Sequence, residues 1–158
     1  MPDVLSIAAP FHGTVAAMSL VPDEVFAQNI VGPGVALVPF DDADVVEVLA
    51  PLSGTITAVF PHAFSIDAGN DVNVLVHLGI DTVTLQGAGF VLHASVGQDV
   101  AVGDLLIEWR PRVAREAGLS VMCPLVAVQA EDSDVRVLAD ESAELQPGAP
   151  LLEWSPGV

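Results

Sequence analysis

Short runs rich in valine, isoleucine, leucine and threonine alternate along the chain with glycine, proline, asparagine and aspartate. Clear examples are the runs 35–38, 45–49, 55–60 and 74–78. Short apolar runs between turn-forming residues predict β-strands. Helical signal is confined to a single turn at 22–27 and a short helix at 111–117, each with proline near its start. The pattern therefore predicts an all-β protein with few short helical turns.

Two sequence motifs occur twice. APFHGTV (9–15) is similar to APLSGTI (50–56), 41 positions later, and GDLLIEW (103–109) is similar to GAPLLEW (148–154), 45 positions later. Two similar offsets favour duplication over chance matches and predict an antiparallel sandwich or barrel of two related halves. Because no linker-like segment interrupts the chain, we expect a single domain, 1–158.

A predicted hairpin brings two histidines together. Gly69-Asn70 lies between two apolar runs and is typical of a two-residue turn. With this turn, His62 directly opposes His77, and their Cβ atoms lie roughly 4.5–5.5 Å apart. A register shift of one residue would separate them. The predicted register allows one phosphoryl group or metal ion to contact both rings.

The charge of the chain limits its partners. Its 158 residues contain four arginines, no lysine and 21 acidic residues, for a formal net charge of -17. Nucleic acid and anionic membranes are therefore poor partners. The charge favours a basic protein partner, and it also suits a solvated surface in a salty cytoplasm.

The single cysteine and one long uncharged segment bear on the compartment. Cys123 has no second cysteine to pair with, so we expect a small buried residue in a reducing cytoplasm. The uncharged segment 4–22 is interrupted by Pro10, Gly13 and Pro22, and it therefore predicts buried strands and not a signal peptide or membrane span.

The histidine pair carries the most specific chemistry in the sequence. A neutral imidazole has a free ring nitrogen near neutral pH, which can accept a phosphoryl group while a second histidine contacts the phosphoryl oxygens. We expect Gly79 to leave room for a partner and Asp81 to orient a ring or to repel excess negative charge. Nearby apolar residues are either core or an exposed interface: Phe26, Ile30, Val31, Phe60, Phe64 and Leu75. His12 and His93 are expected to be structural or surface residues.

Four motifs resemble, in order and spacing, the glucose-type enzyme IIA of the bacterial phosphoenolpyruvate:sugar phosphotransferase system: VFAQNIVGPGVAL, HAFSI, VLVHLGIDTV and GQDVAVGDLLIEW. The resemblance covers about residues 5–153 and implies a duplicated antiparallel β-sandwich. It also implies a cytoplasmic phosphocarrier without a cofactor, in which His77 takes phosphate from HPr and passes it to a cysteine of enzyme IIB. His62 would stabilise the phosphoryl group. The implied partner surface consists of Asp23, Val25, Phe26, Ile30, Val31, Phe60, Leu75 and Asp81.

The sequence departs from the family pattern in two places. Family members commonly carry a threonine and another residue between the strand and the first histidine, where this chain runs Phe60-Pro61-His62. Ser65, Ser53 or a backbone group is expected to replace that hydroxyl in orienting the active histidine. The second departure is the basic stretch 110–112, which is far from the histidines in sequence.

The same residues suggest three alternatives to a phosphocarrier. Zinc bound by His62, His77 and Asp81 is possible at a partner interface, but the H-x-H motif of the zinc peptidases with a similar sandwich is absent. A biotin or lipoyl carrier is excluded because the chain has no lysine. A regulatory relative that binds transporters or enzymes without carrying phosphate stays open. An enzyme IIA contacts phosphate and protein partners but not the sugar, so the sequence does not indicate which sugar is transported. The start at Met1 favours a free-standing protein over one domain of a larger transporter.

Overall fold

The computed structural model describes residues 4–40 and 44–156; Met1 and the ends of the predicted domain 1–158 lie outside these ranges. Within them the chain forms fourteen strands, two short α-helices and three 3-10 turns. The strands are β1 (Leu5–Ala8), β2 (Gly13–Ala16), β3 (Gly34–Pro39), β4 (Val46–Leu49), β5 (Gly54–Phe60), β6 (Ala63–Gly69), β7 (Val72–His77), β8 (Phe90–Leu92), β9 (Asp99–Val100), β10 (Leu105–Trp109), β11 (Cys123–Ala127), β12 (Val135–Val137), β13 (Glu144–Leu145) and β14 (Pro150–Trp154). The helices are α1 (Glu24–Ala27) and α2 (Pro111–Glu116), and the 3-10 turns are η1 (Met18–Leu20), η2 (Thr82–Leu85) and η3 (Asp132–Asp134).

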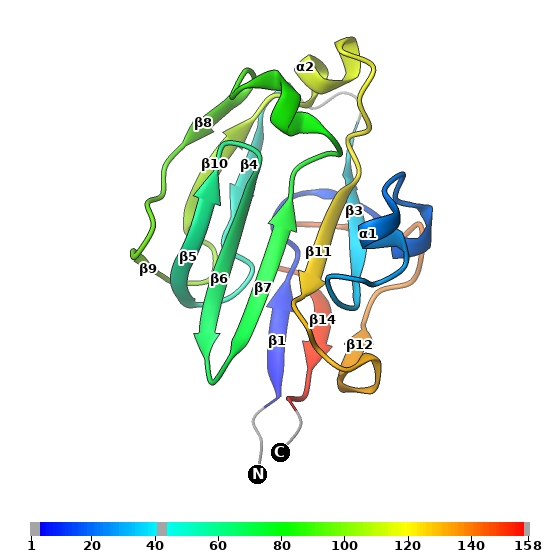
Figure 1. Ribbon diagram of the computed structural model, residues 1–158, viewed down its shortest axis with the longest axis vertical. Coiled ribbons are helices and arrows are strands. Elements are labelled where there is room, and N and C mark those ends of the chain that lie inside the picture. The colour runs from blue at the N-terminus through cyan, green and yellow to red at the C-terminus, as the bar shows by residue number, and fades with distance from the viewer. Residues whose placement is uncertain (1–3, 41–43, 157–158) are drawn as a thin grey trace.

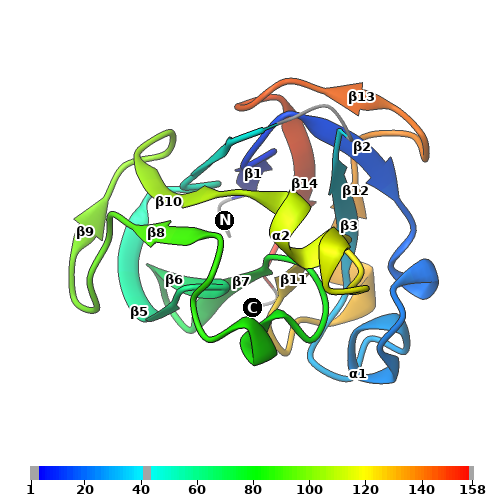
Figure 2. The same ribbon diagram turned by 90° about the horizontal axis from the view of Figure 1, so that it is seen from above.

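The described strands form three antiparallel sheets. The largest has the order β13-β2-β3-β11-β7-β6-β5-β9, and the other two have the orders β1-β14-β12 and β4-β10-β8. The broad face of β5, β6, β7 and β11 is turned toward the viewer in Figure 1. Figure 2 shows β4, β10 and β8 lying across the interior from β5, β6 and β7. The prediction of an all-β antiparallel sandwich is confirmed.

The order of strands in the large sheet reflects the predicted duplication. Reading inward from its two edges, β2 and β5, β3 and β6, and β11 and β7 occupy equivalent places. Main-chain hydrogen bonds repeat in the same way. Ala8 N–H donates to the Pro51 carbonyl and Leu49 N–H donates to the Pro10 carbonyl, both at 2.8 Å. The 41-residue offset exchanges these two bonds, as expected for two halves related by an approximate two-fold axis.

Alternating burial along the strands separates the core from the outer face of the large sheet. In β7 the valines 72, 74 and 76 are buried, whereas Leu75 and His77 point to the other face and are partly exposed. Side chains two positions apart share a face, so the strand itself directs His77 outward.

In the core, the Trp109 ring stacks on Phe90 with centroids 6.0 Å apart. Cys123 is 1% exposed, as predicted, and burial raises the pKa of its thiol.

Both predicted helices are present and are short. The side chain of Asp23 accepts a hydrogen bond from Val25 N–H at 2.9 Å and caps α1. Pro111 opens α2, and Gly118, with φ +78°, follows its last turn. In the described ranges, neither helix approaches the length needed to cross a membrane.

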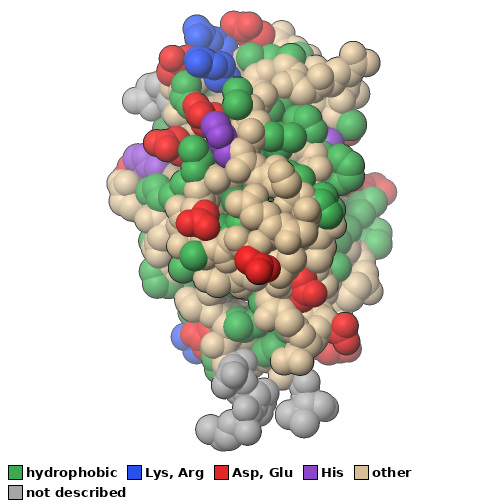
Figure 3. Space-filling view, turned by 90° about the vertical axis from the view of Figure 1, so that its left-hand side faces the viewer, with side chains coloured by type: hydrophobic (Ala, Val, Ile, Leu, Met, Phe, Trp, Pro, Cys, Tyr) green, Lys and Arg blue, Asp and Glu red, His purple; other side chains and the backbone are tan. Residues whose placement is uncertain are grey.

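Acidic side chains are scattered over the face shown in Figure 3, and basic side chains gather mainly at its upper end, near α2. At the start of α2, Arg110 and Arg112 lie 3.6 and 3.2 Å from a carboxylate oxygen of Asp44. All three side chains are exposed, so these ion pairs contribute little stability. The unusual basic stretch 110–112 therefore belongs to the surface around α2.

Candidate active site

The two histidines meet, but not through the predicted register. In the structure His77 pairs with Ala63 on β6, one position away from His62. The hairpin turns at Asn70 and Asp71, both with positive φ, and a register shift lies between Asp67 and Gly69. The predicted turn at Gly69-Asn70 and the direct pairing of His62 with His77 are therefore wrong.

His62 reaches His77 because it lies in the turn before β6 and not on the strand. Its main-chain carbonyl accepts a hydrogen bond from Leu78 N–H at 2.7 Å, which ties the turn to the residue after β7. The two imidazole centroids lie 5.0 Å apart with an interplanar angle of 69°. A residue in a turn is free of strand alternation, so the one-residue shift leaves the rings adjacent.

The orientation of the His77 ring is set by a main-chain carbonyl. His77 Nδ1 lies 2.5 Å from the Gly79 carbonyl oxygen. A carbonyl can only accept, so Nδ1 carries the proton. In the neutral ring Nε2 then keeps its lone pair, which makes Nε2 the nucleophilic atom.

Burial keeps the His77 ring neutral. The dominant effect is desolvation, which lowers the pKa of His77 below its ordinary value. The hydrogen bond to Gly79 and the charges of Asp23 and Asp81 oppose this shift in part. The pKa of His62 is also lowered, first by burial and then by the neighbouring His77. Both rings are therefore mainly uncharged at neutral pH.

Gly79 is present for a different reason from the one predicted. It is buried and so does not face a partner. Its φ of +77° lies in the left-handed region that favours glycine. A Cβ added there would lie 2.7 Å from Thr82 Cγ2 and 2.8 Å from the Ser120 carbonyl oxygen. Only glycine fits this turn without a shift of its neighbours.

The hydroxyl groups of Ser65 and Ser53, which were candidates for orienting His77, form hydrogen bonds with other residues. Ser65 Oγ is hydrogen-bonded to Thr57 Oγ1 at 2.7 Å, and Ser53 Oγ accepts from Val102 N–H at 2.9 Å. Of the three candidates, the backbone group is the one that contacts the ring. Asp81 affects His77 through its charge, while the ring's orienting hydrogen bond goes to Gly79.

Apolar side chains flank both histidines. The ring of Phe26 lies 5.5 Å from that of His77, and the ring of Phe60 lies 5.9 Å from that of His62, measured between centroids. Phe26 is 9% exposed and belongs to a small core cluster against which Val31 and Leu75 pack.

Three of the predicted partner residues are apolar and open to solvent. Val25, Ile30 and Phe60 are 45%, 61% and 55% exposed. Phe64 is instead 1% exposed and belongs to the main core. Exposed apolar side chains grouped around a polar centre are typical of a protein-binding site.

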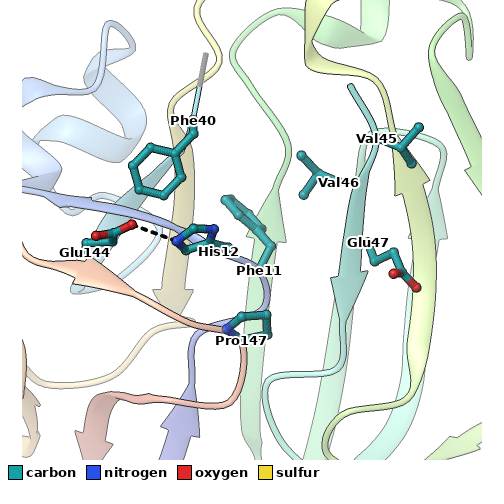
Figure 4. Close-up of a pocket in the computed structure, with 8 residues that line it drawn as sticks. All are labelled: Phe11, His12, Phe40, Val45, Val46, Glu47, Glu144 and Pro147. Atoms are coloured by element: carbon teal, nitrogen blue, oxygen red, sulfur yellow. Dashed lines mark hydrogen bonds and ion pairs between the residues drawn. The ribbon is translucent and has the colours of Figure 1, made fainter. Parts of the chain in front are cut away.

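The remaining two histidines are engaged in surface contacts. His93 Nε2 lies 2.6 Å from a carboxylate oxygen of Glu108. His12 Nε2 lies 2.9 Å from Glu144 at the wall of a cavity of about 490 Å³ (Figure 4). None of the residues that line this cavity is a predicted site residue.

The described residues do not include a group of three or more histidine, cysteine, aspartate or glutamate side chains arranged to hold a metal ion. The suggested zinc site of His62, His77 and Asp81 is therefore not assembled in this chain alone. Zinc shared with a partner at the two histidines stays a prediction.

Two comparisons with known proteins place the chain in a family. The family model described as phosphoenolpyruvate-dependent sugar phosphotransferase system, EIIA 1, matches residues 5–133. The structure is also similar to that of the glucose permease IIA from Mycoplasma capricolum, with a TM-score of 0.82, 30% sequence identity and 96% of each chain covered. The matched residues contain both histidines, α1 and the turn that carries Gly79. The chain therefore belongs to the EIIA 1 family of the phosphoenolpyruvate-dependent sugar phosphotransferase system.

Proposed function

We propose that this protein is a phosphocarrier in which His77 accepts a phosphoryl group from HPr and passes it to a cysteine of enzyme IIB. The observation that carries the proposal is the hydrogen bond from His77 Nδ1 to Gly79, which leaves Nε2 as the nucleophile of a neutral ring.

The single Cys123, without a disulfide partner, is in keeping with a cytoplasmic protein, and we treat 1–158 as one domain.

In the first step, Nε2 of His77 attacks the phosphorus atom of phosphorylated HPr. A bond forms from Nε2 to phosphorus, and the bond from phosphorus to the HPr histidine breaks, so that this histidine regains its lone pair. Nδ1 of His77 keeps its proton, and the phosphorylated ring therefore carries a positive charge. The carboxylates of Asp23 and Asp81, whose charges partly oppose the lowering of the His77 pKa by burial, favour that positive charge.

In the second step, a cysteine thiolate of enzyme IIB attacks the same phosphorus atom. The bond to Nε2 breaks, and the His77 ring becomes neutral again with its proton still on Nδ1. Phosphoryl transfer asks mainly for alignment of the attacking and leaving atoms and for donors near the equatorial oxygens. We propose that His62 supplies one such donor, and the 5.0 Å between the two ring centroids supports this role.

The surface around the pair suits a basic protein. Val25, Ile30 and Phe60 provide exposed apolar area, and the chain carries a net charge of -17. HPr, which is basic around its own histidine in the systems that this family serves, would be attracted by this charge. Such attraction mainly speeds association and weakens as salt increases.

The test is incubation with phosphoenolpyruvate, enzyme I and HPr, followed by intact-mass measurement. Wild type is expected to gain one acid-labile phosphoryl group, and His77→Gln none. His62→Gln should still be phosphorylated but should transfer slowly to enzyme IIB. His93→Gln, whose ring contacts Glu108 at the surface, serves as the control and should behave as wild type.

Failure of the wild type to take up phosphate from verified active partners would overturn the proposal in favour of a regulatory protein that carries no phosphate. Uptake by His77→Gln equal to that of wild type would overturn the assignment of His77.

A further inference from the structure

Thr82 has a polar side chain buried at the centre of the turn that follows β7. It is 0% exposed, and in the described part of the chain it is the one polar residue among the buried side chains. Its Oγ1 donates a hydrogen bond to the Leu78 carbonyl at 2.7 Å. A buried carbonyl that loses such a donor is left without solvent to replace it, so this bond is strongly constrained.

Leu78, which accepts the hydrogen bond of Thr82, connects the main chains of the two histidines. Leu78 N–H donates to the His62 carbonyl at 2.7 Å, and the Leu78 carbonyl accepts from Thr82. The next residue, Gly79, supplies the carbonyl that accepts from His77 Nδ1. A movement of the Leu78 carbonyl rotates the peptide plane that leads directly into Gly79.

The methyl group of Thr82 restrains the same peptide. A Cβ built on Gly79 would lie 2.7 Å from Thr82 Cγ2, so the methyl group packs closely against this glycine. The position of Ile80 is fixed separately, because its N–H donates to the Ser120 carbonyl at 3.0 Å. Thr82 thus contacts both Leu78, through its hydroxyl group, and Gly79, through its methyl group.

We propose that Thr82 is a positioning residue whose hydroxyl holds the Gly79 carbonyl against His77 Nδ1 and thereby sets the tautomer of the His77 ring. The effect on the tautomer concerns the unphosphorylated protein. Only the consequent effect on the rate of phosphoryl transfer rests on the proposed function.

A matched control lies two residues away on the same 3-10 turn. Thr84 Oγ1 also donates to a main-chain carbonyl at 2.7 Å, that of Asp81, but this bond is exposed. The Asp81 carbonyl additionally accepts from Thr84 N–H at 3.1 Å, so removal of the hydroxyl leaves it with a partner. Loss of the Thr84 hydroxyl therefore removes a similar bond without freeing a buried carbonyl.

The experiment compares Thr82→Val, Thr82→Ser and Thr84→Val by two-bond proton–nitrogen-15 correlation spectra of the histidine rings. The nitrogen shifts report whether Nδ1 or Nε2 of His77 carries the proton. Wild type, Thr82→Ser and Thr84→Val are expected to show the proton on Nδ1, because each keeps the hydroxyl of Thr82 or its serine equivalent. Thr82→Val should show a mixture of tautomers.

The rate of phosphorylation by HPr provides the second readout. We expect Thr82→Val to slow it on the order of 10-fold, less than the roughly 100-fold that a misplacement of 1 Å can cause. Thr82→Ser should restore most of the rate. If Thr82→Val does not fold, the pair Thr82→Ser and Thr82→Ala gives the same comparison, since both lack the methyl group and differ in the hydroxyl.

The proposal is overturned if Thr82→Val, or Thr82→Ala in its place, keeps the wild-type tautomer. It is also overturned if Thr82→Ser loses the tautomer while Thr82→Val keeps it, because the methyl group would then be responsible. A wild type that shows the Nδ1 tautomer but accepts no phosphate would contradict the proposed function and leave this inference standing.

Discussion

Replacement of Gly79 by alanine tests how the turn after β7 supports the site. The added Cβ would lie 2.7 Å from Thr82 Cγ2 and 2.8 Å from the Ser120 carbonyl oxygen. Real Cβ atoms do not approach other atoms this closely, so the turn must shift. The Ser120 oxygen cannot retreat without weakening its hydrogen bond from Ile80 N–H, which is 3.0 Å long. The strain therefore falls on the peptide that carries the Gly79 carbonyl.

Two effects set the magnitude. Alanine in the left-handed region costs roughly 1–2 kcal/mol relative to glycine, and overpacking of a buried site costs typically about 1–3 kcal/mol. We therefore expect Gly79→Ala to lower the free energy of unfolding by about 2–5 kcal/mol. The hydrogen bond from His77 Nδ1 should weaken at the same time, and phosphoryl transfer should slow.

Gly118 provides a matched control for the conformational part of this cost. Its φ is +78°, close to the +77° of Gly79, but a Cβ added there meets nothing within 4 Å. Gly118→Ala should therefore lose only about 1–2 kcal/mol. The difference between the two variants isolates crowding, because the change in unfolded-chain entropy is common to both.

Urea unfolding with linear extrapolation measures both variants, provided that the slope m is unchanged. If Gly79→Ala costs no more than Gly118→Ala, the turn is not crowded in the way described. The neighbours of Gly79 would then not be what requires a glycine at this position.

Three further predictions concern titration, the apolar surface and the buried thiol. Burial lowers the pKa of His77 below the ordinary 6.5, so the unfolded state binds more protons than the folded state as the pH falls through 6.5, and stability falls on acidification. His77→Gln should therefore lose less stability than wild type between pH 7 and pH 5 in urea titrations. Equal losses in the two proteins would contradict the pKa shift. Phe60→Ser should weaken binding of HPr by about 1 kcal/mol or more in calorimetry. Val96→Ser should not, because Val96 is 65% exposed and precedes Gly97, whose N–H donates to the Ile56 carbonyl in the other half of β5. Equal effects of the two substitutions would argue against a local docking surface. Cys123 should resist alkylation in the native protein, because it is 1% exposed and burial raises the pKa of its thiol. It should react once urea unfolds the chain. Fast labelling of the native protein would show that the thiol is accessible and contradict this prediction.

The duplicated sandwich is predictable from the sequence because its repeated motifs occupy equivalent places in the two halves. Ala9 and Ala50 both follow short strands and both donate to a main-chain carbonyl in the loop before β14 or β10, at 2.8 Å in each case. Glycine, proline and the apolar positions of these turns are constrained by backbone geometry. The repeat therefore survives as a readable pattern.

The register of the histidine hairpin is not predictable in the same way. Gly69, Asn70 and Asp71 all adopt positive φ, and all three residue types tolerate it, so the sequence allows a turn at either Gly69-Asn70 or Asn70-Asp71. The sequence nevertheless predicts that His62 and His77 converge. It arises from the turn that precedes β6, whose position depends on the Leu78 hydrogen bond and not on the pairing of the strands.

The contacts that orient the active ring are also hidden from the sequence. The Gly79 carbonyl is a backbone atom, and the same glycine fits an open approach for a partner or a crowded left-handed turn. Thr82 gives no stronger signal, because a threonine in an apolar run is common on strands and turns alike. The sequence does indicate that a turn follows β7, because the alternation of apolar and polar residues ends there and is followed by Gly79 and Asp81. It does not indicate which atoms this turn brings into contact with His77.

The proposed role of His77 is tested most directly by phosphorus-31 and nitrogen-15 NMR of the protein labelled with nitrogen-15 and phosphorylated through HPr. Coupling between phosphorus and nitrogen identifies the atom that carries the phosphoryl group. We expect phosphorus on Nε2 of His77, with the proton retained on Nδ1, which donates to the Gly79 carbonyl. Phosphorus on Nδ1 of His77, or on His62, would contradict it.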